Sequence, residues 1–180
     1  MRSDALLAFV PIGGNLSLVG GAGVAIPSTN VIDMLGSGVG TMPNSIIGNV
    51  SLFGTDMGVG LWRPELNVLI GDSLTTANAA TLNIQLQAAP DTAVTHLPGA
   101  WSTIVESGYM AAADLVAGAV PFRTPWLPVF PPNLRPRYLR LNFQPLAATS
   151  FDTGSISSAI VTTVRDDQSN KYAARNYTVA

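Results

Sequence analysis

The residues able to do chemistry are few in this sequence, and they are scattered. The chain has one histidine, His96, in a Thr-His-Leu-Pro-Gly turn context. A lone histidine is a poor basis for a Ser-His-Asp arrangement or a metal centre, so we expect a solvated loop residue. The stretch 36–40 (Gly-Ser-Gly-Val-Gly) resembles a phosphate-binding loop. It lacks the Lys-Ser/Thr pair of such loops, and a flexible turn is expected instead.

Acidic residues offer no better starting point. Calcium takes roughly six to eight oxygen ligands, and Asp166 with Asp167 beside Arg165 does not make such a cage. No pattern among the 11 acidic residues selects the opposed carboxylate pair of a glycosidase. The absence of cysteine excludes disulfides and thiolate metal sites. The sequence therefore predicts a protein that is not an enzyme and that holds no cofactor and no metal.

Charge is scarce along the whole chain. Charged residues make up 11% and hydrophobic residues 47%, whereas an ordinary soluble domain has roughly 25% charged residues. A chain of this composition leaves apolar surface in water unless partner chains cover it. The net charge of −2 supplies no basic field for nucleic acid. We therefore expect protein partners and no nucleic-acid partner.

The mean hydropathy of +0.33 raises the question of a membrane. The uncharged stretch 5–32 is repeatedly interrupted by proline and glycine, so no window supplies the roughly 20 apolar residues of a spanning helix. Asp4 and Pro11 also make the start of the chain a poor signal peptide. We expect a soluble protein with no membrane partner, not exported by the general secretory route.

The elements that must position any site are predicted to be strands. Apolar and polar residues alternate strictly in 82–87 (Leu-Asn-Ile-Gln-Leu-Gln). The pattern repeats in 137–144, where Leu139, Leu141 and Phe143 are expected to face the core. Strands that alternate apolar and polar residues, separated by turn residues, indicate an antiparallel sandwich in which one face of each sheet is exposed to solvent.

Further segments give weaker signals. In 155–164 we expect Ile156, Ile160 and Val164 to share one face of a strand. The segment 110–116 is the only helix-like piece of the sequence. Two more strand candidates are 66–70 and 101–105.

We expect one domain in two parts. Residues 1–60 hold 12 of the 17 glycines and only four charges, so helix is disfavoured there. We predict that 1–60 form an extended N-terminal arm with the first short strands, stabilised by lying on something else. Residues 61–180 are predicted to be the main body of the single β-sandwich. Short apolar pieces within the arm are 6–10, 16–19, 31–35 and 46–53.

A proline-rich segment stands apart from the strands. Residues 121–136 hold six of the thirteen prolines, with Trp126 and Phe130 among them. Proline cannot donate to a sheet ladder, so we expect an extended connector or an edge segment. Its stiff backbone would lose little entropy on docking, which favours an interface strap. A long loop that closes the sandwich is an equally good interpretation.

Four stretches of the chain carry a resemblance. They are 28–33 (Ser-Thr-Asn-Val-Ile-Asp), 80–87, 137–143 (Arg-Tyr-Leu-Arg-Leu-Asn-Phe) and 151–156 (Phe-Asp-Thr-Gly-Ser-Ile), the last running on to a tail at 171–179. In this order they resemble the Bbp16-type capsid cement proteins of short-tailed bacteriophages. The Gly-rich, uncharged stretch 34–55 is an addition to that pattern, and we expect it to form an arm over neighbouring chains.

The resemblance implies an all-β fold, an antiparallel jelly-roll sandwich with a Gly-rich extended N-terminal arm. It implies a cement or decoration protein that binds the outer surface of the major capsid shell and stabilises it against internal DNA pressure. The implied partners are the major capsid protein and further copies of this chain, with a dimer favoured over a trimer. The implied location is the virion, on the capsid outer surface, after synthesis in the host cytoplasm.

The candidate interface residues are apolar, aromatic and arginine side chains of the kinds enriched at interface centres. They are Leu6, Leu7, Phe9, Trp126, Phe130, Arg135, Arg137, Tyr172, Arg175 and Tyr177. The alternative function is a glycan-binding jelly-roll module of a receptor-binding structure. In that case Trp62, Trp101 or Trp126 would stack on sugars.

Overall fold

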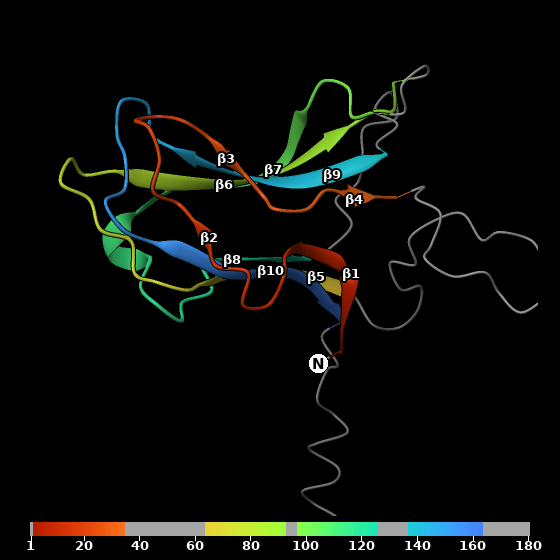
Figure 1. Ribbon diagram of the computed structural model, residues 1–180, viewed down its shortest axis with the longest axis horizontal. Helices are drawn as coiled ribbons and strands as arrows, with labels where there is room; N and C mark the ends of the chain where they lie inside the picture. The colour runs from red at the N-terminus through yellow and green to blue at the C-terminus, as the bar shows by residue number, and fades with distance from the viewer. Residues whose placement is uncertain (1, 35–63, 93–96, 126–136, 164–180) are drawn as a thin grey trace, which may run out of the picture.

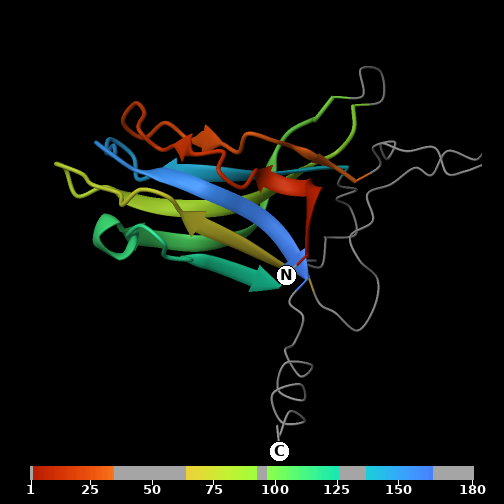
Figure 2. The same ribbon diagram turned by 60° about the horizontal axis from the view of Figure 1, so that its bottom comes forward.

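The computed structural model describes residues 2–34, 64–92, 97–125 and 137–163, which form an all-β protein. Two antiparallel sheets lie face to face, one above the other in Figure 1. The strands of the first sheet lie side by side in Figure 2. Their order is β1 (Arg2–Val10), β10 (Ser155–Thr163), β5 (Pro64–Ile70) and β8 (Phe122–Pro125), with β2 (Leu16–Ser17) also paired to β10.

The second sheet is centred on the two strands with the clearest alternation. Its order is β3 (Ile26–Pro27), β9 (Tyr138–Pro145), β6 (Thr81–Ala89) and β7 (Ser102–Ala111), with β4 (Ile32–Asp33) also paired to β9. The weaker strand candidates 66–70 and 101–105 are confirmed as parts of β5 and β7.

The core lies between the sheets and is filled by alternate residues of each strand. Leu139, Leu141 and Phe143 of β9 are buried in it, as predicted. Leu82, Ile84 and Leu86 of β6, the neighbouring strand of the same sheet, lie beside them and point into the same core. Full burial of each such side chain contributes about 1.5–3 kcal/mol.

The prediction for β10 was wrong in one respect. Ile156 belongs to the core, but Ile160 does not share its face, because the pairing with β5 shifts between Ile156 and Ser158. Beyond this bulge the parity is reversed, so Ala159 and Val161 point into the core.

The described part of the N-terminal third is built into the sandwich. β1 pairs with β10 at the edge of the first sheet, and β3 and β4 pair with β9 in the second. Val10, Leu18 and Ile32 lie in the common core. Residues 2–34 therefore belong to the domain itself, whereas the predicted apolar piece 46–53 lies outside the described residues.

The helix predicted for 110–116 is not formed. Met110 and Ala111 end β7, and only Ala112–Asp114 make a single 3-10 turn. Leu115 is fully buried and accepts a backbone hydrogen bond from Leu74, which ties the chain back to the sandwich. By contrast, the start of the proline-rich segment forms the edge strand β8, the place in a sheet where proline is tolerated.

Candidate functional site

The breaks between the described segments lie at one end of the sandwich. In the first sheet, Thr163 is paired with both Arg2 and Pro64, and Glu65 is paired with Pro125. Each of these positions is at or next to an end of a described segment. The same sheet end therefore carries the chain into the segments 35–63, 126–136 and 164–180.

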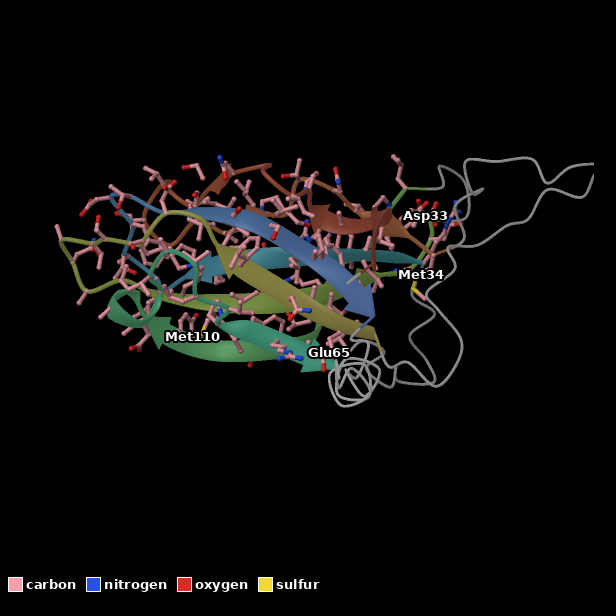
Figure 3. All side chains as sticks on the ribbon, turned by 90° about the horizontal axis from the view of Figure 1, so that it is seen from below. Asp33, Met34, Glu65 and Met110 are labelled. Carbon is pink, nitrogen blue, oxygen red and sulfur yellow. The ribbon has the colours of Figure 1, made fainter. Side chains whose placement is uncertain are left out.

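In the second sheet, too, residues next to the breaks in the described chain are paired with one another. Tyr138 is paired with both Asp33 and Ala89. Figure 3 shows Asp33 and Met34 at the end where Glu65 also lies, with Met110 towards the other end. We call this the junction end, defined by Arg2, Asp33, Glu65, Asp91, Pro125, Arg137 and Thr163.

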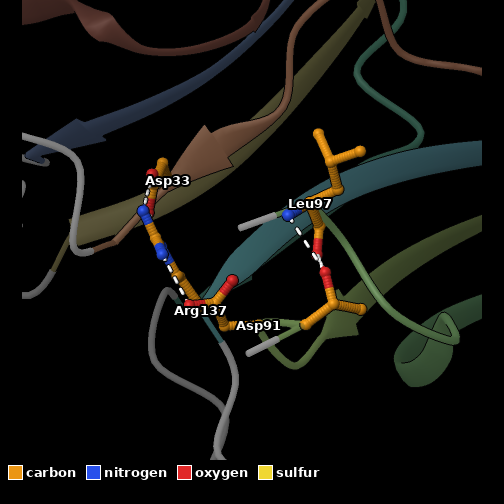
Figure 4. A network of polar contacts seen from close by, with 5 residues as sticks. Asp33, Asp91, Leu97 and Arg137 are labelled. Atoms are coloured by element: carbon orange, nitrogen blue, oxygen red, sulfur yellow. Dashed lines mark hydrogen bonds and ion pairs between the residues drawn. The ribbon is translucent and has the colours of Figure 1, made fainter. Parts of the chain in front are cut away.

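A charged network centred on Arg137 occupies the junction end. Its Nε and Nη2 donate to the two carboxylate oxygens of Asp33, each at 3.0 Å, and its Nη1 donates to Asp91 Oδ2 at 2.7 Å. Figure 4 shows the guanidinium between the two acids. It also lies 5.0 Å from the centre of the Tyr138 ring. The hydrogen bonds that Arg137 donates to Asp33 and Asp91 raise the pKa of Arg137 above its usual range.

Backbone pairing places these side chains together. Met34 donates its N–H to the Arg137 carbonyl, and Arg137 donates its own to the Ala89 carbonyl. Arg137 is thus held between the strand that carries Asp33 and the turn that carries Asp91. Both acids bind the same cation, so the network acts as a clamp that joins three segments of the chain.

The turn after β6 is itself closed by hydrogen bonds. Thr92 Oγ1 donates to the Leu97 carbonyl at 2.8 Å and accepts from the Leu97 N–H at 3.1 Å. Gly99 donates its N–H to the Pro90 carbonyl. His96, the one histidine, lies between these closures and outside the described residues.

A second ion pair lies at the junction end of the first sheet. Arg123 Nε on β8 donates to Glu65 Oε2 on β5. The side chain of Arg123 is 58% exposed, so this pair contributes little stability on its own. Its effect is to pair Glu65, at this end of the sheet, with a cation of the same chain.

The predicted interface residues fall into three groups. Leu6 and Leu7 lie on β1, in the part of the strand whose side chains are not described. The prediction of Phe9 as an interface residue is wrong, because its position on β1 faces the second sheet and its side chain is fully buried in the core. Arg137 lies at the junction end. The others are outside the described residues: Trp126, Phe130, Arg135, Tyr172, Arg175 and Tyr177.

Other sequence candidates also lie outside the described residues. They are Trp62, the glycine stretch 36–40 and the pair Asp166 and Asp167. Over the ranges that are described, no three His, Cys, Asp or Glu side chains gather as a metal-binding group.

Sequence reasoning missed the partners of Arg137. Asp33 and Asp91 carry no local signal for this role, because the network joins three segments far apart in sequence. It also missed the outer face of β6 and β9, where Gln85, Gln87 and Arg140 point away from the core. Their polar positions in the alternating strands were visible, but their mutual hydrogen bonds were not.

No protein-family model matches this chain, and no curated protein matches its sequence. The described ranges contain no helix with the length and apolar character needed to span a membrane.

Proposed function

We propose that the sandwich is a jelly roll. The support is a nested pairing of strands: β1 with β10, β3 and β4 with β9, β5 with β8, and β6 with β7. Rolling one long antiparallel hairpin into two sheets produces this nesting. The additional pairs, β10 with β5 and β6 with β9, are the ones that join the rolled hairpin into sheets.

The function we propose is that of a capsid cement protein. It binds the outer surface of a phage's major capsid shell and stabilises that shell against internal DNA pressure. The observation that carries the proposal is the junction end. The segments with the predicted anchors Trp126 and Phe130, and Tyr172 and Tyr177, continue from Pro125 and Thr163, which flank Pro64 and Glu65 in one sheet.

The attachment of several segments to one end of the sandwich suits a cement role. Anchors on separate segments attached to one end can contact one surface together, and linked weak contacts give a combined affinity far above that of each alone. The arginines whose side chains are described at this end are paired with carboxylates, Arg137 with Asp33 and Asp91 and Arg123 with Glu65. A protein partner fits such an end better than nucleic acid does. The partners proposed are the major capsid protein and a second copy of the chain, and the place is the virion surface.

Co-sedimentation with capsids tests this proposal. The purified full chain is added to capsids of the phage that encodes it, stripped of the native protein, and bound chain is measured. We expect Trp126→Ser with Phe130→Ser to lower occupancy at least about tenfold. The control is Val116→Ser with Val120→Ser, two exposed apolar side chains in the loop between η1 (Ala112–Asp114) and β8. Equal occupancy of both double variants would contradict docking through the junction end.

The alternative proposal, a glycan-binding module, has one described feature in its favour. The outer face of β6, β7 and β9 carries planar polar side chains next to Trp101. Of the three tryptophans considered for sugar stacking, Trp101 is the one whose surroundings are described.

A further inference from the structure

The outer face of the second sheet is lined by polar side chains in register across three strands. Gln85 of β6 lies opposite Glu106 of β7 and Asn142 of β9. One step along β6, Gln87 lies opposite Thr103 and Arg140. The intervening residues of β6 and β9 fill the core, so this set faces away from it.

Hydrogen bonds hold these side chains in fixed orientations. Gln85 Oε1 accepts from Gln87 Nε2 and from Asn142 Nδ2, each at 3.1 Å. Gln87 Oε1 accepts from Arg140 Nε at 2.9 Å. Side chains that are already ordered lose little entropy when a ligand binds, so the face is organised in advance for a polar ligand.

Arg140 differs from the other arginines whose side chains are described. Arg123 and Arg137 are paired with carboxylates, whereas no carboxylate of the described chain pairs with Arg140. Its guanidinium lies 4.2 Å from the centre of the Trp101 ring and uses only Nε in a hydrogen bond. Burial lowers the pKa of Arg140. A partly buried cation with its two terminal nitrogens unused within the described chain is suited to accept an anion.

The polar side chains next to Arg140 limit which chemical class of ligand this face can bind. Within the described residues, Gln85 Nε2 has no hydrogen-bond partner, and Gln85 lies one residue pair along the same face from Arg140. Asn142, opposite Gln85, is only 6% exposed and serves to hold Gln85 in place. A sugar hydroxyl can accept from the Gln85 amide, and the C–H face of a sugar packs against an aromatic ring. Protein interfaces have apolar centres, and the centre of this face is made of amides.

We propose that this face binds an acidic saccharide. The sugar carboxylate pairs with the two terminal nitrogens of Arg140, a neighbouring hydroxyl accepts from Gln85 Nε2, and Trp101 supplies the adjoining apolar contact. This role goes beyond capsid binding and does not depend on it.

Titration of the purified full chain, without capsids, tests the proposal. The probes are a galacturonate hexamer, a neutral maltohexaose and a glutamate hexapeptide, followed by calorimetry and tryptophan fluorescence. We expect saturable binding of the galacturonate hexamer, and at least about tenfold weaker binding of the other two. Absence of saturable galacturonate binding would overturn the proposal. Equal binding of the glutamate peptide would overturn the assignment to a sugar and favour a protein partner.

Matched variants locate the site. Arg140→Gln keeps a side chain that can donate to Gln87, and it should weaken galacturonate binding at least about tenfold. Arg123→Gln removes the same charge from the other sheet and should leave the affinity within about twofold. Equal losses would mean that net charge, not this face, governs binding. If Arg140→Gln does not fold, Arg140→Lys replaces it. Lysine lacks the forked donor pair, so wild-type affinity in folded Arg140→Lys would contradict the proposal.

Discussion

Arg137 binds Asp33 through two parallel hydrogen bonds of 3.0 Å, although 104 residues separate them in the sequence. Asp91, 46 residues before Arg137, accepts a third bond at 2.7 Å. One side chain, directly before β9, therefore joins β4 and the turn after β6 at the junction end. The geometry of the end that we propose to dock on a shell depends on this residue.

Replacing Arg137 tests how much the clamp contributes. Arg137→Gln leaves the Asp33 and Asp91 carboxylates close together without a cation between them. We expect it to lower the Tm of the full chain by roughly several degrees, measured by scanning calorimetry. Arg123→Gln, which breaks one exposed pair, should change the Tm much less. The same Tm for both variants would mean that the clamp does not stabilise the fold.

A glycine at the other end of the sandwich fixes how the loops pack. Gly154 has a φ of +134°, and a Cβ there would lie 2.6 Å from Leu74 Cγ, in the buried core. Gly118 also has a positive φ, +82°, but a Cβ there would meet no atom within 4 Å.

The two glycines should therefore respond differently to alanine. Gly118→Ala adds only backbone strain, about 1 kcal/mol. Gly154→Ala adds a clash with Leu74 and should cost about 1–3 kcal/mol more, measured by urea unfolding. Equal destabilisation would show that Leu74 moves aside freely.

Alkaline pH should destabilise the protein through Tyr138. Burial raises the pKa of Tyr138 above the ordinary value of 10.0, and the charge of Arg137 opposes this only in part. A pKa that is higher in the folded chain gives stability that is fully present below pH 10.0 and is lost as the pH rises through the raised value.

Urea unfolding between about pH 8 and pH 11 measures this dependence. The unfolding free energy of the wild type should fall above the ordinary tyrosine pKa. Tyr138→Phe should show a shallower fall over the same range. Identical pH profiles would mean that the Tyr138 ring is as well solvated in the folded chain as in the unfolded one.

Features that depend on one strand at a time were predictable from the sequence. Leu82, Ile84 and Leu86, and Leu139, Leu141 and Phe143, alternate with polar residues because one face of each strand meets the core. Features that depend on pairing were not. The bulge after Ile156 reverses which side chains of β10 face inward, and the small residues around Ser157 give no pattern that reveals it.

For the candidate sites, too, residue types were predictable from the sequence, whereas contacts between distant segments were not. Arg137 was predicted as an interface residue by its type, but Asp33 and Asp91 could be joined to it only once β4 and β9 were paired. Phe9 was misplaced because a large apolar residue fits both a core and an interface. The convergence of separate segments at one end follows from the strand order, which local patterns do not specify.

Heating capsids tests the proposed cement function most directly. A ligand that binds the assembled shell alone raises the temperature at which the shell ruptures. Stripped capsids, stripped capsids with the full chain added back, and native capsids are heated, and DNA release is followed with a DNA-binding dye. We predict that the added chain restores rupture to the native temperature without any metal or nucleotide, and that Trp126→Ser with Phe130→Ser fails to do so. Rupture of bare and decorated capsids at the same temperature would contradict the cement function.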